Sequence, residues 1–318
     1  KGACTAPSTR PAPRSPNILH NKHTVNHAHH RILPQRAPEP TASASTAAAA
    51  PLPPTHTVEL VPPQTNAFMR AVAGAHFLGS SILVILACYV PLLPLTLWSL
   101  VFDKKRRRGP DFIVSLWARL TLVFFGAKVV VEGVENLPPA DEPVLFCPTH
   151  CSFLDIFALS GFLPRRFKYV SKIEILRIPL VGWAMGFAKH IAIRRSDRAS
   201  QLQTLKDAVD CLADGSSLVT FPEGTRSKDG RLMDFKKGPF AMAARAGRRV
   251  VPISIVGTHL YYPSSALFPI AWPRGIRIVC HVPLDAPVAK GEAATLKECY
   301  AQVRSSLPSS MHPLEKST

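Results

Sequence analysis

The pattern of apolar and polar positions divides the chain into four regions. Residues 1–65 lack helical or strand periodicity and predict a disordered leader. Residues 66–131 carry long apolar runs, which predict a membrane-anchoring helical region. Residues 132–300 alternate strand and helix patterns, as in an α/β domain, and residues 301–318 are expected to form a C-terminal tail.

Short apolar runs within residues 132–300 predict buried strands. The intervening segment Ser200–Ala213 has helical spacing and ends near Gly215, which is a plausible helix stop. Strands separated by helices indicate a mostly parallel mixed sheet flanked by helices. The predicted strands are 143–147, 167–170, 190–193, 217–221, 250–256 and 276–282, and the apolar face of the helix holds Leu202, Leu205, Val209 and Leu212.

An uncharged run from Ala71 to Phe102 exceeds the roughly 20 residues that span a bilayer. Pro91 and Pro94 are expected to kink or divide it, which leaves a broken span or a re-entrant hairpin open. The basic cluster that follows at 104–108 favours membrane attachment. A second stretch, 112–131, predicts an amphipathic interfacial helix. A buried core helix is the alternative for both runs.

The formal charge of +17, from 38 basic and 21 acidic residues, suits anionic partners. Nucleic acid is disfavoured, because aromatic residues are not interleaved with the basic clusters. The 7 cysteines show no paired framework, which indicates a reducing compartment. The leader is rich in Ala, Pro, Ser, Thr, His and Arg and poor in acids, a composition typical of organellar transit peptides.

Two groups of potential metal ligands are present, and neither predicts a metal site. Cys147, His150 and Cys151 lie close together, but no second cluster with ligand spacing accompanies them. A histidine tract at 20–30 lies in the predicted leader, where a plain disordered tail is the simpler interpretation.

His150 and Asp155 carry the first chemical signal. A histidine and a carboxylate can form a general base with its orienting partner. On one continuous helix, residues five apart point about 140° apart and could not face one substrate. The pattern at 152–155 predicts a helix start capped by Ser152, which leaves His150 in the preceding loop, free to fold back. The alternative is an ordinary loop histidine beside a capping box.

A second signal, Glu223–Ser227, directly follows a predicted buried strand, where ligands bind in open α/β sheets. Gly224 permits a tight turn, and Arg226 can bind a phosphate through its planar guanidinium group. Nearby basic residues add to an anion-binding edge. They are Arg194, Arg195, Arg198, Lys236 and Lys237. A surface turn with a local Glu–Arg pair is the alternative.

Four blocks in this order resemble the glycerolipid acyltransferase family, and more narrowly its plastid 1-acylglycerol-3-phosphate acyltransferases. The blocks are 150–155, 191–195, 221–227 and 251–253, within a resemblance that covers roughly 110–285. Arg195 matches the arginine of the family's second block. Thr149 departs from the family, which often has Asn there.

The resemblance implies a role for each matching residue. His150 would act as general base with Asp155 as its partner, and backbone N–H groups at the helix start are one option for the oxyanion. By analogy Arg195, Glu223 and Arg226 would bind the glycerol phosphate. Gly224 and Thr225 would shape the turn, and Lys237 is a weaker candidate for the phosphate.

The implied reaction transfers an acyl group from a thioester of acyl-carrier protein or coenzyme A to the sn-2 hydroxyl of lysophosphatidic acid. The product would be phosphatidic acid, formed without a cofactor or metal. The implied location is the plastid membrane, at the inner envelope with the catalytic domain facing the stroma. Three alternatives remain open: another acceptor such as glycerol 3-phosphate or another lysophospholipid, a hydrolase, or a non-enzymatic basic membrane-binding protein.

Overall fold

The computed structural model describes residues 61–194 and 196–314, so Arg195 and nearly all of the predicted leader lie outside the described residues. The described part contains a seven-stranded sheet. Its strands are β1 (Val129–Glu132), β2 (Leu145–Pro148), β3 (Phe167–Lys172), β4 (Ile191–Ile193), β5 (Ser217–Val219), β6 (Val250–Val256) and β7 (Ile276–Cys280).

The strand order is β1-β7-β6-β2-β5-β3-β4. Every neighbouring pair is parallel except β6 and β7, which are antiparallel. The predicted α/β class with a mostly parallel mixed sheet is therefore confirmed. The carboxyl ends of β2 and β5, which are neighbours, lie at the same edge of the sheet.

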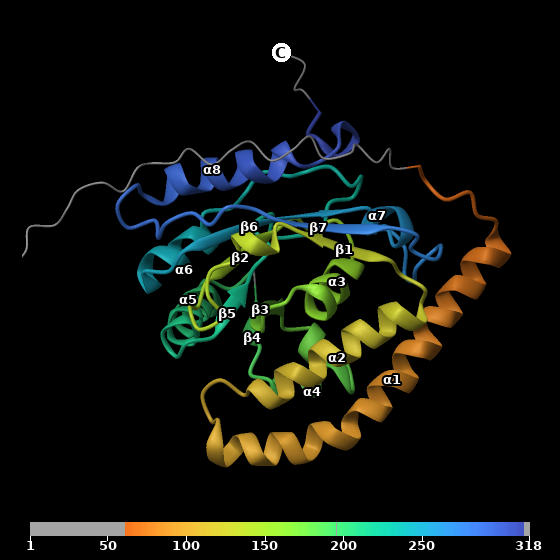
Figure 1. The fold of residues 1–318 in the computed structure, drawn as a ribbon, viewed down its shortest axis with the longest axis horizontal. Helices are drawn as coiled ribbons and strands as arrows, with labels where there is room; N and C mark the ends of the chain where they lie inside the picture. Colours follow the sequence, from red (N-terminus) through yellow and green to blue (C-terminus); the bar gives the residue numbers. More distant parts are fainter. Residues whose placement is uncertain (1–60, 195, 315–318) are drawn as a thin grey trace, which may run out of the picture. The chain divides into compact units, whose positions relative to one another are not determined.

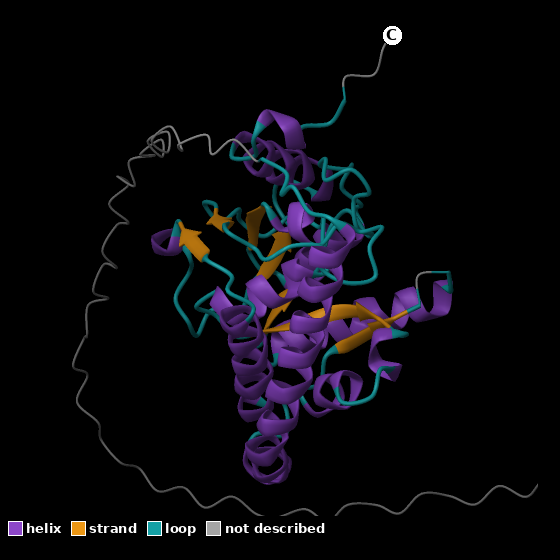
Figure 2. Cartoon of the chain, turned by 90° about the vertical axis from the view of Figure 1, so that its right-hand side faces the viewer, coloured by secondary structure: helices purple, strands orange, loops and turns teal. Residues whose placement is uncertain are grey.

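Helices cover both faces of the sheet (Figures 1 and 2). One face packs against α2 and α3, and the other packs against α5, α6 and α8. The helices are α1 (Ala67–Phe102), α2 (Arg108–Phe124), α3 (Leu154–Phe162), α4 (Val181–Phe187), α5 (Arg198–Ala213), α6 (Gly238–Ala246), α7 (Thr258–Tyr261) and α8 (Glu292–Ser305), with 3-10 turns at Val134–Asn136, Ile175–Arg177 and Ser309–Met311.

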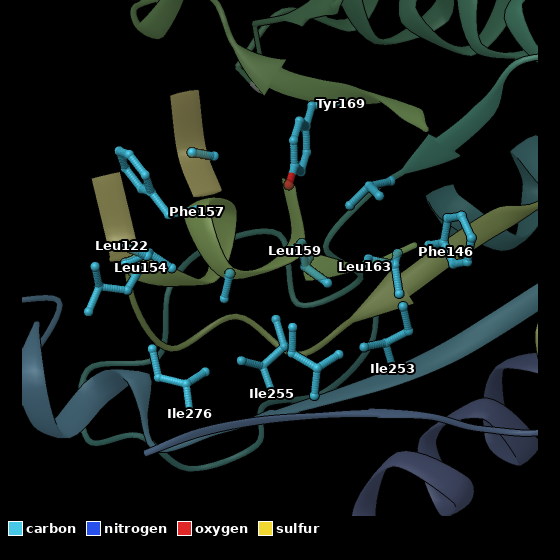
Figure 3. Close-up of a cluster of buried hydrophobic side chains, with 14 of the residues drawn as sticks. Leu122, Phe146, Leu154, Phe157, Leu159, Leu163, Tyr169, Ile253, Ile255 and Ile276 are labelled. Carbon is cyan, nitrogen blue, oxygen red and sulfur yellow. The ribbon is translucent and has the colours of Figure 1, made fainter. Parts of the chain in front are cut away.

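Alternation along the strands fills both cores. In β2 the side chain of Phe146 joins the core under α2 and α3, whereas Leu145 and Cys147 join the core under α5, α6 and α8. Figure 3 shows the first core, which includes Leu122 and Phe157 from the helices and Ile253 from β6. Each such buried side chain contributes roughly 1.5–3 kcal/mol relative to exposure.

Helix α5 confirms the predicted helix, and its buried face overlaps the predicted face in part, because Leu212 is buried and Leu205 packs partly buried against the core. Its buried residues are Thr204, Ala208 and Leu212, and Leu202 is 58% exposed. Asp197 caps the helix, because its side chain accepts the N–H of Ala199 at 2.9 Å. Thr204 and Ala208 share the sheet-facing side with Leu205 and Leu212, which apolar spacing alone does not predict.

Helix α1 is continuous from Ala67 to Phe102, so the expected division at Pro91 and Pro94 does not occur. Proline removes an N–H donor and bends a helix without having to end it, and Figure 1 shows α1 curving. Among the described residues, α1 is the one helix that is long and apolar enough to cross a membrane. Its N-terminus is capped by Asn66, whose side chain accepts the N–H of Met69 at 2.8 Å.

Helix α2 ends at Phe124 and not near residue 131. Val129–Glu132 instead forms β1, which pairs with β7, so the sheet begins before the expected domain boundary at 131/132. Three consecutive β-branched valines favour this extended conformation. At the other end, residues 301–305 continue α8, and Met311 is 1% exposed, so the expected tail is part of the folded domain as far as it is described.

A buried ion pair joins α2 to the sheet. Lys168 of β3 is 1% exposed, and its ammonium group donates to the Asp111 carboxylate at 2.5 Å and to the Ala188 carbonyl at 2.6 Å. Burial raises the pKa of Asp111, and the charge of Lys168 opposes that rise. The pair therefore fixes α2 against the strand that leads to Tyr169 and Lys172.

Candidate active site

His150 follows β2, and the Glu223–Ser227 turn follows β5, so the two predicted motifs meet at the carboxyl edge of the sheet. The Ser227 N–H donates to the His150 carbonyl at 2.8 Å, which ties the two segments directly. Parallel neighbouring strands explain why segments more than 70 residues apart in sequence come together here.

The His150 side chain folds back onto Asp155 as predicted. His150 Nδ1 lies 2.9 Å from Asp155 Oδ2, and the same oxygen accepts the backbone N–H groups of Cys151 and Ser152, both at 2.8 Å. Helix α3 begins at Leu154, which places His150 in the loop before it. The N-cap position of α3 is occupied by Phe153 and not by the predicted Ser152. Asp155 is 0% exposed, and it closes the helix start by accepting these loop N–H groups while it also holds the imidazole.

This bonding defines the proton positions on His150. A carboxylate only accepts hydrogen bonds, so His150 Nδ1 donates to Asp155 and the lone pair of the neutral ring lies on Nε2. The second oxygen, Oδ1, accepts the hydroxyl of Thr258 at 2.5 Å. Asp155 thus has four donors and little freedom to turn, which orients the imidazole as a base.

The sequence reasoning missed Thr258. It lies at the start of α7, directly after β6 and Gly257, whose φ of 94° makes a sharp turn at the strand end. The hydroxyl is 0% exposed and has the Asp155 carboxylate as its partner. A polar residue at the carboxyl end of a predicted strand was the available signal.

Four aromatic rings form a row across neighbouring parallel strands. His150 stacks on Phe221 with ring centroids 3.8 Å apart, Phe221 faces Tyr169 at 6.4 Å, and Tyr169 faces His190 at 5.7 Å. All three pairs are within 17° of parallel. His150 and Phe221 follow the ends of β2 and β5, Tyr169 lies in β3, and His190 directly precedes β4. The row therefore crosses these neighbouring strands in their order in the sheet.

A cavity of about 330 Å³ lies along this row and includes all four rings in its wall. Helices α2, α3 and α4 supply its apolar side, including Trp117, Phe157 and Met185. Its polar wall includes Arg226 and Lys172. The cavity therefore places an imidazole beside both an apolar channel and cationic side chains. Lys172, at the end of β3, was not among the predicted site residues.

Glu223 does not face the cavity as a ligand-binding carboxylate. It is 2% exposed, and its oxygens accept the N–H groups of His150 at 2.6 Å and Met233 at 3.1 Å. Burial raises the pKa of Glu223 to about 8, while these two hydrogen bonds oppose the rise. The surface Glu–Arg pair does not form among the described side chains; Glu223 instead holds the loop that carries His150.

The remaining predicted residues separate into three environments. Thr225 and Arg226 line the cavity with His150. Gly224 has φ +74°, a conformation that disfavours a side chain, and an added Cβ would also have to displace the flexible end of the Lys236 side chain, whose carbon atoms lie 2.9 Å from it. Lys237 is exposed at the start of α6 and does not line this cavity. Arg195 lies outside the described residues.

The backbone N–H groups at the start of α3 are already engaged. Those of Cys151 and Ser152 donate to Asp155, and that of His150 donates to Glu223. The N–H group of Leu154 donates to Ser152 Oγ at 3.1 Å. They hold the loop together, so these N–H groups are poor candidates for the oxyanion. The cationic side chains on the cavity wall, Arg226 and Lys172, are the alternatives.

Residues 128–256 match the family model described as Acyltransferase. A 1-acyl-sn-glycerol-3-phosphate acyltransferase of Chlamydomonas reinhardtii is 40% identical over 246 residues, which cover 77% of this chain and 73% of the relative. A chloroplastic protein of the same name from Arabidopsis thaliana is 42% identical over 190 residues, 60% of this chain and 52% of that relative.

The crystal structure of PlsC, the 1-acyl-sn-glycerophosphate acyltransferase from Thermotoga maritima, has a similar fold. The TM-score is 0.61 at 25% sequence identity, and the alignment covers 75% of this chain and 94% of that one. The resemblance inferred from the four sequence blocks is thereby confirmed. With the paired His150 and Asp155 at the sheet edge, these matches show that the chain belongs to the 1-acyl-sn-glycerol-3-phosphate acyltransferase family.

Proposed function

We propose that this enzyme transfers a fatty acyl group from an acyl thioester to the sn-2 hydroxyl of 1-acylglycerol 3-phosphate, forming phosphatidic acid. The observation that carries the proposal is the His150–Asp155 pair, with the imidazole in the wall of a cavity that is largely apolar and has cationic groups in its wall. An amphipathic acceptor with a phosphate and an acyl chain fits this combination.

In the proposed reaction His150 Nε2 takes the proton from the acceptor hydroxyl as its oxygen attacks the thioester carbonyl carbon. The C–O bond forms, and the resulting tetrahedral intermediate carries an oxyanion. Collapse breaks the C–S bond, and the imidazolium returns the proton to the departing thiolate. Asp155 stabilises the imidazolium throughout and keeps its orientation. The thioester is already activated, so no acyl-enzyme is required.

Arg226 is the proposed phosphate ligand, because a guanidinium binds phosphate oxygens through two parallel hydrogen bonds. It lines the same cavity as His150, and Lys172 adds a second cation. Gly224 and Thr225 form the turn that presents Arg226. Arg195 and Lys237 are assigned to the same anion by family resemblance alone. Glu223 acts indirectly, through the His150 backbone.

The proposed acyl site is the apolar side of the cavity, between the row of rings and helices α2, α3 and α4. Its side chains are mainly aromatic and aliphatic, and burying a methylene group against them is worth roughly 0.8 kcal/mol. The channel begins beside His150, where the thioester carbon must lie for attack.

The proposed location is a plastid membrane, and more finely the inner envelope with the catalytic domain facing the stroma. Relatives from Arabidopsis thaliana and Brassica napus are chloroplastic by name. Helix α1 has many exposed apolar side chains, such as Leu83 at 70% and Val90 at 76%. These properties support α1 as the membrane anchor.

The basic cluster after α1 is partly engaged with the folded domain. Lys105 forms a 2.7 Å ion pair with the Asp214 side chain, and Arg106 donates to the Asp214 carbonyl at 2.8 Å. Asp214 follows α5, so this contact joins the end of the anchor to the α/β domain. Lys104 and Arg107 are the members of the cluster that we expect to contribute most to contact with anionic lipid.

The decisive experiment is a donor-by-acceptor assay with purified protein. Acyl-carrier-protein and coenzyme A thioesters are each offered with lysophosphatidic acid, glycerol 3-phosphate and a non-phosphorylated monoacylglycerol. Phosphatidic acid is the expected product, and His150→Ala is expected to reduce the rate 10²- to 10⁴-fold. Preference for glycerol 3-phosphate would reassign the acceptor. Liposome binding without release of thiol from any donor would instead support a non-enzymatic membrane protein.

A further inference from the structure

The loop between α7 and β7, residues 262–275, exposes apolar side chains at its tip. Leu267 is 79% exposed and Phe268 is 41% exposed. Trp272 and Arg274 follow on the same loop, and these residue types are enriched where proteins meet lipid headgroups. A single exposed leucine is ordinary on a protein surface, so the surroundings of this one decide what it means.

The loop packs directly against α1, the proposed membrane anchor. Gly74 of α1 permits a close approach, since a Cβ added there would lie 3.1 Å from Phe268 Cβ. The Trp272 indole N–H donates to Nδ1 of His76, also on α1, at 2.9 Å. The start of α1 beside the loop is itself apolar and open, with Phe68 75% exposed (Figure 1). The exposed tip of the loop is therefore continuous with the surface that we assign to the membrane.

The same loop is bonded to the segment that carries the catalytic pair. Ser152 Oγ donates to the Tyr262 carbonyl at 2.7 Å, and Ser152 forms a β-bridge with Pro263. The Ser152 N–H is one of the donors to Asp155. Tyr262 in turn reaches the tip, because its hydroxyl donates to the Leu267 carbonyl. Two residues, Ser152 and Tyr262, thus connect the exposed tip to the carboxylate that orients the base.

Tyr262 is packed between the anchor and the catalytic loop. It is 8% exposed, and its ring centroid lies 6.2 Å from that of Phe77 in α1 and 5.9 Å from that of Phe153 before α3. Both contacts are edge-to-face, as aromatic pairs in a close-packed core prefer. A buried ring that is held on both sides shifts only together with its neighbours. A movement of the loop tip is therefore passed on to the residues beside Asp155.

We propose that the Leu267–Phe268 tip dips into the lipid surface that holds α1, and that Tyr262 couples this contact to the orientation of Asp155. The inference rests on the proposed acyl transfer and membrane attachment, and it adds an interaction surface and a positioning residue to them. Lipid contact removes the apolar tip from water. A loop fixed at its tip holds Tyr262 in place, and Tyr262 holds Ser152. Transfer is thereby favoured at the bilayer, where the amphipathic acceptor resides.

A photoreactive benzophenone amino acid in place of Leu267 identifies the partner of the tip. The full chain is reconstituted in vesicles of phosphatidylcholine and phosphatidylglycerol, irradiated and analysed by mass spectrometry. Val288 is the matched control position, because it is 70% exposed and follows β7, which runs antiparallel to β6 and so ends at the edge of the sheet opposite His150. We expect a severalfold higher yield of lipid adduct at position 267 than at position 288. Equal yields overturn the inference. The yields do not depend on turnover, so they decide the surface even if wild-type protein transfers no acyl group, a result that would end the proposed function.

Leu267→Glu, Tyr262→Phe and the double variant test the coupling, by kcat with lysophosphatidic acid in the same vesicles. Leu267→Glu places a charge where lipid would lie, and Tyr262→Phe removes only the hydroxyl that reaches the Leu267 carbonyl. We expect each single variant to lower kcat on the order of fivefold, the factor that corresponds to one lost hydrogen bond, while vesicle binding through α1 persists. Because the two residues act in one connection, the double variant should be no slower than the slower single variant. Val288→Glu should keep the wild-type kcat. Multiplied losses in the double variant, or equal kcat in Leu267→Glu and Val288→Glu, overturn the inference.

Discussion

His150 and Asp155 are joined by a 2.9 Å hydrogen bond to an oxygen that also caps the first turn of α3. Asp155 Oδ2 has three donors and Oδ1 has the Thr258 hydroxyl, so the orientation of the imidazole is coupled to the helix start. The two readings of the sequence motif, helix cap or catalytic partner, are therefore not alternatives. One carboxylate performs both structural tasks.

Asp155→Asn should reduce kcat by at least about 10²-fold, because an amide cannot accept at both positions and would favour the wrong tautomer of His150. Thr258→Val is the graded control, since it removes one hydrogen bond to Oδ1 and leaves the His150 contact in place. We expect a loss of roughly 1 kcal/mol in stability and a smaller fall in kcat from that variant. Steady-state kinetics measure kcat, and thermal unfolding measures stability, in both variants. Equal kcat in Asp155→Asn and wild type would exclude an orienting role.

Arg226→Ala should raise KM for lysophosphatidic acid on the order of tenfold or more, since a charged hydrogen bond is worth about 1.5–3 kcal/mol. The KM for a monoacylglycerol that lacks phosphate should rise much less in the same variant. Glu223→Ala provides the contrast: Glu223 holds the His150 backbone, so its loss should lower kcat with both acceptors alike. If Arg226→Ala impairs the two acceptors equally, Arg226 is not the phosphate ligand.

Much of the sheet could be predicted because buried parallel strands are short, apolar and bounded by turns. β6, predicted at 250–256, is Val250–Val256 in the structure. The edge strand β1 was assigned to the preceding helix, because the apolar run was read through Gly126, which has φ +78° and follows the C-cap of α2. Periodicity distinguishes strand from helix poorly over so few residues.

The two halves of the site were predictable to different degrees. The sequence places His150 and Arg226 directly after predicted strands, which was enough to predict that both lie at one edge of the sheet, and in the structure they line one cavity. The inward orientation of Glu223 was not predictable, because its partners are backbone N–H groups, which nearly every residue type carries. Thr258 and His190 were missed for a related reason: their contacts depend on register between segments distant in sequence.

Lys168→Met should destabilise the protein by about 3–5 kcal/mol, because it leaves the Asp111 carboxylate buried near the domain core without its partner. Replacing both residues in Asp111→Leu/Lys168→Met should recover much of that loss, as apolar pairs often match buried ion pairs in stability. Denaturant unfolding of the single and double variants in detergent gives the coupling energy. A double variant no more stable than Lys168→Met would show that packing, and not the unpaired charge, causes the loss.

The buried histidines predict that the enzyme loses stability in mild acid. Burial lowers the pKa of His281 to about 4 and that of His190 to about 3, below the value of about 6.5 in the unfolded chain. As the pH falls below 6.5, the unfolded state binds protons that the folded state excludes, so the free energy of unfolding falls. Each histidine should contribute roughly 2 kcal/mol of this loss between pH 7 and pH 5. His281→Gln should be less stable at both pH values but show a drop smaller by about that amount, measured by denaturant unfolding. An identical drop in the variant and the wild type would mean that His281 already takes up its proton in the folded state.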